Sequence, residues 1–246
     1  MWYMPYMRVR SAVQVYAYFA VGISLVAIAL RYWPGALHLE GQDQRLHSFH
    51  VDVLALIAGS AALVGGLATV LGLNLASEND GHLEIAWTKP VSREGYALGV
   101  FAVDIAAMVV CLFITVVCVA IVLDVYTGSQ AVTFGPNPEL LRVLAFCGAP
   151  LCVYGWIAAL SASIKHNRGA VAGLFWPLMF VVALLHVVPI PVVHNVAAVL
   201  NLFNPIEIYS SSDSGPQPSP WSYAWGWALA VIMLTAAVLQ WRRLQL

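Results

Sequence analysis

Six long apolar segments constrain the fold of this chain more than any other feature of its sequence. An α-helix rises about 1.5 Å per residue, so about 20 consecutive apolar residues are needed to cross the roughly 30 Å hydrocarbon core of a bilayer. The segments cover residues 11–33, 51–75, 96–123, 141–164, 169–189 and 221–241. The sequence therefore predicts an all-α integral membrane protein, with six transmembrane helices in a single transmembrane domain over residues 1–246.

The composition agrees with this class. Hydrophobic residues make up 61% of the 246 residues and charged residues only 9%, whereas soluble domains are roughly 45–50% apolar. Mean hydropathy is +0.81. The formal net charge of −1 provides no general attraction to nucleic acid. We therefore expect membrane lipid around the chain and no nucleic acid among its partners.

Lysine and arginine indicate which ends of the predicted helices face the cytoplasm, because positively charged flanks stay on that side during insertion. With the N-terminus inside, the cytoplasmic set is Arg8, Arg10, Lys89, Arg93, Lys165, Arg168, Arg242 and Arg243, and the outer set is Arg31, Arg45 and Arg142. The excess inside predicts that both termini are cytoplasmic. The loop between the second and third spans then faces the cytoplasm too.

That loop, residues 77–94 with the sequence S-E-N-D-G-H-L-E-I-A-W-T-K-P-V-S-R-E, is unusually polar for this chain. Ser77 is suited to cap a short helix whose first turn carries Glu78 and Asp80, because carboxylates stabilise the positive end of a helix dipole. Apolar residues then supply a contact surface before Pro90 ends the helix. The sequence predicts a short cytoplasmic helix that another protein can bind.

Nucleotide-binding and catalytic motifs do not occur in the sequence. The two lysines, Lys89 and Lys165, follow Thr88 and Ile164, so there is no Gly-Lys-Ser/Thr phosphate loop. There is likewise no G-x-S-x-G, H-E-x-x-H or C-x-x-C pattern. We therefore expect a chain that is not an enzyme and that carries no catalytic residue, no cofactor and no metal of its own.

Asp104 lies two to three turns into the third predicted span. A charge in the hydrocarbon region costs at least about 2.5–3.5 kcal/mol on insertion scales, so this side chain should face the protein interior. Asn74 or a backbone donor is the expected partner. A structural polar contact and a position in a transport path both remain open.

The second span carries a stripe of small residues that lets another helix approach closely. The partner is either another span of this chain or a second copy at a dimer seam. The stripe consists of Ala58, Ala62 and Gly66, recurring every four residues, beside Ala61, Gly65 and Thr69.

An amphipathic helix is expected just outside the fifth span. Val193, Val196, Ala197 and Leu200 follow i, i+3, i+4, i+7 spacing. The run Asn204-Pro205-Ile206 should end this outer, re-entrant or interfacial helix before a linker that reaches the last span.

The cytoplasmic loop resembles that of permease subunits of type-2 ABC exporters, which reads like E-x-x-x-G-T-L-E-x-L-L-x-x-P-V-S-R. His82 stands where Thr is common, and Ala86-Trp87 replace the usual Leu pair. The six-span topology and the outer helix fit the same family. The residues that match are Glu78, Gly81 at or near its place, Leu83, Glu84, Pro90, Val91, Ser92 and Arg93.

The resemblance implies a division of labour. A separate ABC ATPase subunit, in two copies, would hold ATP and Mg and act on a coupling helix in the loop. A second permease subunit, identical or paralogous, would complete the transmembrane unit, which exports an unidentified substrate across the cytoplasmic (inner) membrane of a prokaryote. The residues implied in ATPase coupling are Glu78, Gly81, Leu83, Glu84, Trp87, Pro90, Val91, Ser92 and Arg93.

Two other functions fit the sequence. Imidazoles gathered on the outer side can bind copper, zinc or haem iron, which indicates metal or haem handling, or copper-enzyme maturation. The last of these draws on the run of residues 204–209, which is similar to permeases that support periplasmic copper enzymes. The second alternative is a non-transporting membrane scaffold. The outer histidines are His38, His47, His50, His186 and His194, with His47 and His50 spaced i, i+3.

Overall fold

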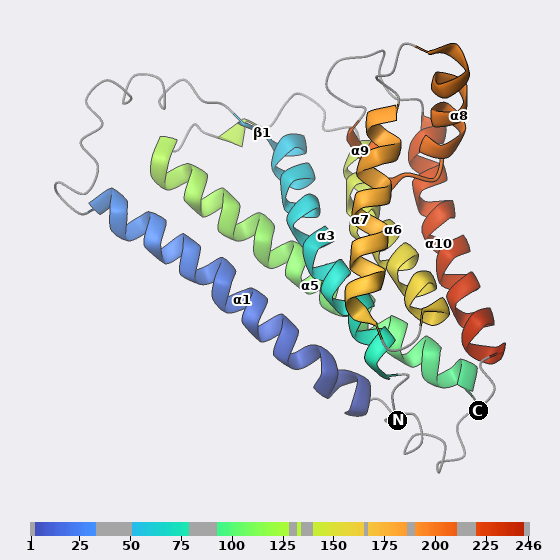
Figure 1. Ribbon diagram of the computed structural model, residues 1–246. Helices are drawn as coiled ribbons and strands as arrows, with labels where there is room; N and C mark the ends of the chain where they lie inside the picture. The colour runs from blue at the N-terminus through green and yellow to red at the C-terminus, as the bar shows by residue number, and fades with distance from the viewer. Residues whose placement is uncertain are drawn as a thin grey trace.

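The computed structural model describes residues 3–32, 51–78, 93–127, 132–133, 140–164, 167–185, 190–210 and 220–243 (Figure 1). These residues are helical apart from short connections and one two-residue strand pair. The longer helices are α1 (Tyr3–Tyr32), α3 (Val53–Glu78), α5 (Arg93–Thr127), α6 (Leu140–Ser163), α7 (Arg168–Leu185) and α10 (Pro220–Arg243), and the shorter ones are α8 (Pro191–Asn201) and α9 (Pro205–Ser210).

The helices have the apolar character of a membrane protein. Three of them, in the described part of the chain, are long and apolar enough to cross a bilayer, over Leu56–Asn74, Gly95–Val122 and Phe146–Ser163. The other longer helices contain shorter apolar stretches, Ala12–Leu25, Gly169–Leu185 and Ala224–Gln240. The predicted helical membrane-protein class is therefore right.

The strand pair was not predicted. β1 (Val51–Asp52) pairs in parallel with β2 (Val132–Thr133), with Val51 opposite Val132. Residues 51 and 52 were expected to begin the second span, but α3 begins only at Val53. The pair joins the start of α3 to the segment that follows α5.

Most predicted helix limits agree with the structure to within four residues. The exception is α1, which begins at Tyr3, eight residues before the predicted start of the first span. Pro5 lies in its first turn, where a backbone N–H has no partner within the helix and proline is tolerated. The first span is therefore continued towards the N-terminus by one long helix.

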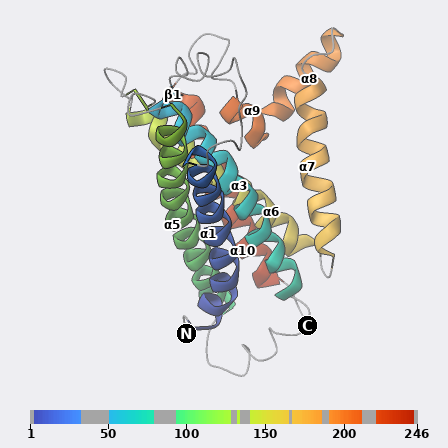
Figure 2. The same cartoon turned by 90° about the vertical axis from the view of Figure 1, so that its left-hand side faces the viewer.

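The longer helices alternate in direction through the bundle (Figures 1 and 2). One end of the bundle gathers the start of α1, the end of α3, the start of α5, the junction of α6 with α7, and the end of α10. The short helices α8 and α9 lie at the opposite end (Figure 2). The two ends of the bundle thus carry different elements.

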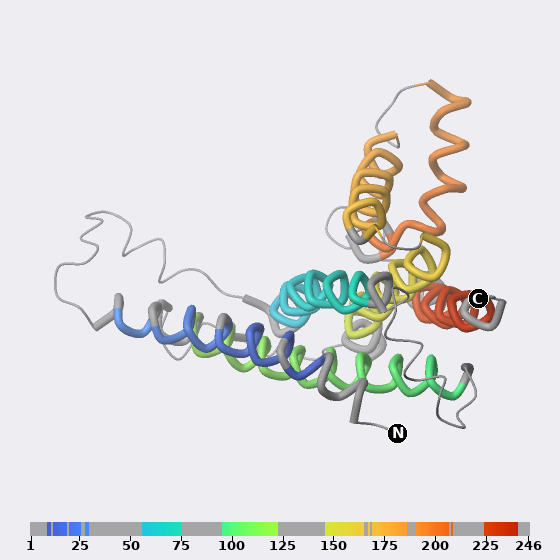
Figure 3. Tube along the Cα trace, turned by 60° about the horizontal axis from the view of Figure 1, so that its bottom comes forward, coloured from blue at the N-terminus to red at the C-terminus, as the bar shows by residue number. Residues whose placement is uncertain are grey.

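Helix α6 forms the centre of the packing. Its most extensive contacts are with α10 and α3, while α5 packs on α1, α3 and α10. Helices α7 and α8 lie on the other side of α3 and α6 from α1 and α5 (Figure 3). We call the trio α3, α6 and α10 the central slab.

Two glycines allow the backbones of the central slab to approach closely. A Cβ atom at Gly72 of α3 would lie 2.7 Å from Cγ2 of Ile157 on α6. A Cβ atom at Gly155 of α6 would lie 3.1 Å from the carbonyl oxygen of Ala230 on α10. Ser161 adds a direct tie, because its Oγ donates to the carbonyl oxygen of Gly72 at 2.9 Å. Small residues thus let the helices of the slab pack closely. Close packing stabilises helix contacts in lipid, where the hydrophobic effect provides no attraction between helices.

The predicted small-residue stripe is not where α3 makes its closest approach. A Cβ atom at Gly65 or Gly66 would meet nothing within 4 Å, and Ala62 is exposed. A cavity of about 280 Å³ lies beside Ala61 and Gly65, between α3, α6, α7 and α9. Within the chain, the close approach of α3 to another helix is therefore at Gly72 and not at Gly65 or Gly66.

Candidate functional site

The predicted coupling residues fall at the junction between α3 and α5. Glu78 is the last residue of α3 and Arg93 is the first residue of α5. Both therefore lie at the end of the bundle where α1 begins and α10 ends (Figure 1). The remaining coupling residues, Gly81, Leu83, Glu84, Trp87, Pro90, Val91 and Ser92, lie outside the described residues.

The expected helix cap at Ser77 is wrong. Ser77 and Glu78 continue α3, so Ser77 does not begin a new helix. The sequence before them, N-L-A, contains no helix breaker, and the helix propensities of alanine, leucine and glutamate are high. Glu78 is thus at the C-terminal end of one helix instead of in the first turn of another.

Basic positions collect at the same end of the bundle. Arg8 and Arg10 lie near the start of α1, Arg168 begins α7, and Arg242 and Arg243 end α10. Arg31 and Arg142, which were assigned to the outer side, lie at the opposite ends of their helices, near the end of α1 and the start of α6.

Asp104 occupies the middle of the buried face of α5. This face repeats with the helical period and is formed by Ala97, Val100, Phe101, Asp104, Ala107, Met108, Cys111 and Thr115. Asp104 is 0% exposed, so the prediction that it faces the protein interior is confirmed. It lies eleven residues after Arg93, or about 16 Å along the helix, roughly half the depth of a hydrocarbon core.

Tyr154 of α6 donates a hydrogen bond to Asp104. The tyrosine hydroxyl donates to Oδ2 of the carboxyl group, and both side chains are 0% exposed. Phe101 packs edge-on against the Tyr154 ring, with centroids 6.0 Å apart and planes at 88°. The polar pair is thus enclosed between α5 and α6 and sealed by an aromatic ring, as buried polar groups in a membrane protein require.

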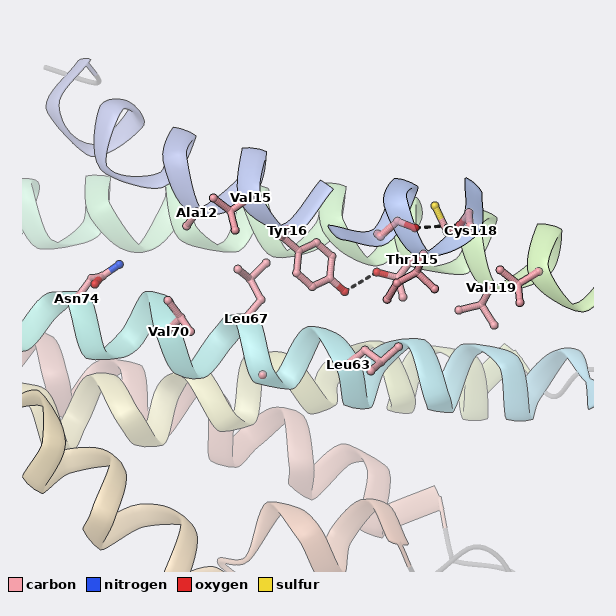
Figure 4. A pocket seen from close by; sticks show the side chains of 15 residues that line it. Ala12, Val15, Tyr16, Leu63, Leu67, Val70, Asn74, Thr115, Cys118 and Val119 are labelled. Atoms are coloured by element: carbon pink, nitrogen blue, oxygen red, sulfur yellow. Dashed lines mark hydrogen bonds between the residues drawn. The ribbon is translucent and has the colours of Figure 1, made fainter. Parts of the chain in front are cut away.

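A groove of about 810 Å³ lies between α1, α3 and α5 (Figure 4). Apolar side chains from all three helices line it, including Val15, Ile23, Leu63, Val70, Val119 and Val122. Asp104 and Tyr154 do not line this groove. The groove and the buried polar pair are therefore separate features of the bundle.

Tyr16 and Thr115 form a polar contact within the groove, with their hydroxyl oxygens 2.6 Å apart (Figure 4). Thr115 donates its single proton to the carbonyl oxygen of Cys111 at 2.7 Å. Tyr16 must therefore be the donor to Thr115, since a threonine hydroxyl has one proton. This bond ties α1 to α5.

At the opposite end of the bundle, Asn204 organises the connection from α7 through α8 to α9. Its Nδ2 donates to the carbonyl oxygen of Met179 on α7 at 3.0 Å, and its Oδ1 accepts from the backbone N–H of Ile206 at 3.0 Å. The second bond caps α9. A helix is present over the predicted amphipathic segment, and it ends at Asn201, while Pro205 begins α9.

Two tryptophans fasten this connection to the slab. Trp156 of α6 donates from Nε1 to the carbonyl oxygen of Phe203 at 3.0 Å, and Trp225 of α10 donates to that of Leu202 at 2.6 Å.

In α8, Ala197 is buried, but Val196 and Leu200, also expected on the apolar face, are 53% and 43% exposed. That face is therefore only partly covered by the chain.

The outer histidines are mostly outside the described residues, which include only His194 of this set, an exposed residue on α8. In the described part of the chain, no group of three or more His, Cys, Asp or Glu side chains is placed to hold a metal ion.

Sequence reasoning missed the tyrosine partner of Asp104 and the Tyr16–Thr115 contact. Hydroxyl residues inside apolar helices were the available signal, because they usually bond across helices or to their own backbone. Pairing them requires knowing which helices are neighbours.

No protein-family model, curated protein or solved structure significantly matches this chain.

Proposed function

We propose that this chain is the transmembrane permease subunit of an ATP-driven exporter of the type-2 ABC class. The observation that carries the proposal is the loop of residues 77–94, whose E-x-x-G-x-L-E pattern and P-V-S-R ending resemble the ATPase-binding loop of such permeases. The chain has no phosphate loop of its own. A separate ATPase with bound ATP and Mg supplies the energy.

The arrangement of helix ends supports a cytoplasmic position for this loop. The end of α3 and the start of α5, which flank the loop, share one end of the bundle with the basic starts of α1 and α7 and the basic end of α10. Basic flanks are retained in the cytoplasm. The proposed topology has six spans with both termini inside, in the inner membrane of a prokaryote.

The contacts of α3 with α6 connect the loop mechanically to the rest of the bundle. Force applied at the end of α3 reaches α6 through the Ser161–Gly72 hydrogen bond and the tight contact at Ile157. A second permease subunit, identical or paralogous, completes the unit. Two ATPase subunits that close on ATP then move the loops of both permeases.

Co-purification with an ATPase tests the proposal. The chain is expressed with its genomic neighbours and captured by a tag, and retained ATPase is measured by mass spectrometry and ATP hydrolysis. The variants Leu83→Asp and Glu84→Lys should weaken retention by at least about 30-fold, the equivalent of losing a hot spot of about 2 kcal/mol.

Glu207→Lys is the matched control, because it makes the same charge change on α9 at the opposite end of the bundle. It should leave ATPase retention unchanged. The proposal is wrong if no ATPase is retained by the unmodified chain, or if Glu84→Lys and Glu207→Lys behave alike while both variants elute as folded protein.

A further inference from the structure

The groove between α1, α3 and α5 has the size of a ligand site. Its volume of about 810 Å³ lies within the roughly 300–1,000 Å³ typical of small-molecule pockets. Along α1 it extends from Ala12 to Ser24, twelve residues or about 18 Å. One leaflet of a hydrocarbon core is about 15 Å deep, half of roughly 30 Å. The groove therefore has the length of one membrane-embedded hydrocarbon chain.

The hydroxyl groups in the groove have no proton to offer a ligand. Ser24 donates to the carbonyl oxygen of Ala20 at 2.9 Å, Thr115 donates to that of Cys111, and Tyr16 donates to Thr115. A ligand carbonyl or phosphate beside these groups would lose its hydrogen bonds to water and gain none from them, which is costly. The groove thus selects against an ester or charged headgroup in its interior.

The two ends of the groove differ. Ala12 of α1 and Asn74 of α3 lie together at one end, while Leu63, Cys118 and Val119 lie towards the other (Figure 4). Asn74 places an amide near the end of the bundle where α1 begins. A polar headgroup is therefore best accommodated outside the groove at the Ala12–Asn74 end.

From this geometry we infer that the groove binds a single long hydrocarbon chain of an amphiphile, with the headgroup projecting past Ala12 and Asn74. Tyr16 and Thr115 lie in the middle of the bound chain, where their mutual hydrogen bond keeps both hydroxyls satisfied without the ligand. The inference goes beyond the proposed function, because it requires neither an ATPase nor a second permease subunit. The occupant is one acyl chain of a membrane phospholipid, whose headgroup then stays in the headgroup layer beside the Ala12–Asn74 end.

Photolabelling of the purified full chain in phosphatidylcholine vesicles tests this inference. The probe is a phosphatidylcholine that carries a diazirine near the terminal methyl group of one acyl chain, and labelled peptides are mapped by mass spectrometry. Label should concentrate on the groove segments of α1, α3 and α5 above the level on α7, whose exposed Leu184 and Phe180 report general contact with apolar molecules. Free palmitic acid added to the vesicles should leave this label unchanged, because the occupant is a phospholipid of the bilayer.

Two glycines of α3 provide a matched pair for this experiment. Gly66 lines the groove and Gly59 does not, and a Cβ atom at either meets nothing within 4 Å. Gly66→Phe should fill the groove and reduce its label to the level on α7, whereas Gly59→Phe should leave the label unchanged. Val70→Trp, on the same wall of the groove, is a second filling variant that guards against misfolding of the first.

Two results would overturn the inference. One is label on α1, α3 and α5 that equals the label on α7, or that persists in both filling variants. The other is a short bis-maleimide cross-link between Cys118 of two chains, because Cys118 lines the groove and the link would show that a second copy covers it. Neither result affects ATPase retention, so this inference and the proposed function fail independently.

Discussion

Replacement of Gly72 by alanine tests the close contact at the centre of the bundle. The new Cβ atom would lie 2.7 Å from Cγ2 and 3.0 Å from Cβ of Ile157. Both atoms are near the backbone of a β-branched residue that is 0% exposed, so they cannot rotate away. Helices α3 and α6 must separate, and the Ser161–Gly72 hydrogen bond of 2.9 Å must lengthen.

The expected magnitude follows from a matched substitution. Overpacking a closely packed interface costs about 1–3 kcal/mol, while exchanging glycine for alanine in a helix gains up to about 1 kcal/mol. Gly59→Ala, in the same helix with open space around its Cβ, receives only the gain. Because the gain cancels in the comparison, Gly72→Ala should be less stable than Gly59→Ala by about 1–3 kcal/mol.

Reversible unfolding in mixed dodecylmaltoside and dodecyl sulfate micelles, followed by far-ultraviolet circular dichroism, measures this difference. Ile157→Ala provides an internal check, because it removes Cγ2, the atom in closest contact. In the double variant the two losses should fall short of additivity by at least about 1 kcal/mol. Equal stability of Gly72→Ala and Gly59→Ala, or strict additivity with Ile157→Ala, would refute the packing argument.

Two further substitutions test other contacts. Tyr154→Phe removes the tyrosine donor from the buried carboxyl group of Asp104 and should cost about 1–3 kcal/mol in the same unfolding assay. Tyr18→Phe, at an exposed position, is the control and should change stability by less than about 0.5 kcal/mol. Similar losses in both variants would contradict the assigned bond. Asn204→Ala removes the bonds to Met179 and Ile206 and should cost about 0.5–2 kcal/mol. Backbone amides of α8 and α9 should then exchange hydrogen faster than in the Asn195→Ala control, which changes an exposed residue of α8. Exchange in α6 should be the same in both variants.

The helices could be predicted from the sequence because their signal is local. An apolar run of sufficient length has few alternatives to a membrane-embedded helix, and the predicted limits of α3, α5, α6, α7 and α10 lie close to those observed. The interior position of Asp104 followed from the cost of exposing a carboxylate to lipid. Both inferences need only the residue and its neighbours along the chain.

Contacts between helices could not be predicted in the same way. The small-residue stripe around Gly65 and Gly66 satisfied the rule for close packing, yet the tight approach is at Gly72, because the crossing of α3 with α6 decides which small residue is used. The pairing of Asp104 with Tyr154 likewise depends on which side chain of α6 reaches across to α5. The coupling residues of the loop remain a prediction from sequence alone.

The unequal attachment of the helices has a consequence for any change of shape. The helices of the central slab approach closely at Gly72 and Gly155, so α3, α6 and α10 are expected to move together as one rigid unit. Helix α7 packs on α3 and α6 through Val171, Phe175 and Met179, over a smaller contact than those within the slab. A rotation that begins at the α3–α5 junction would therefore displace α7 relative to the slab first, and the cavity between α3, α6, α7 and α9 would change in width before the slab itself is strained.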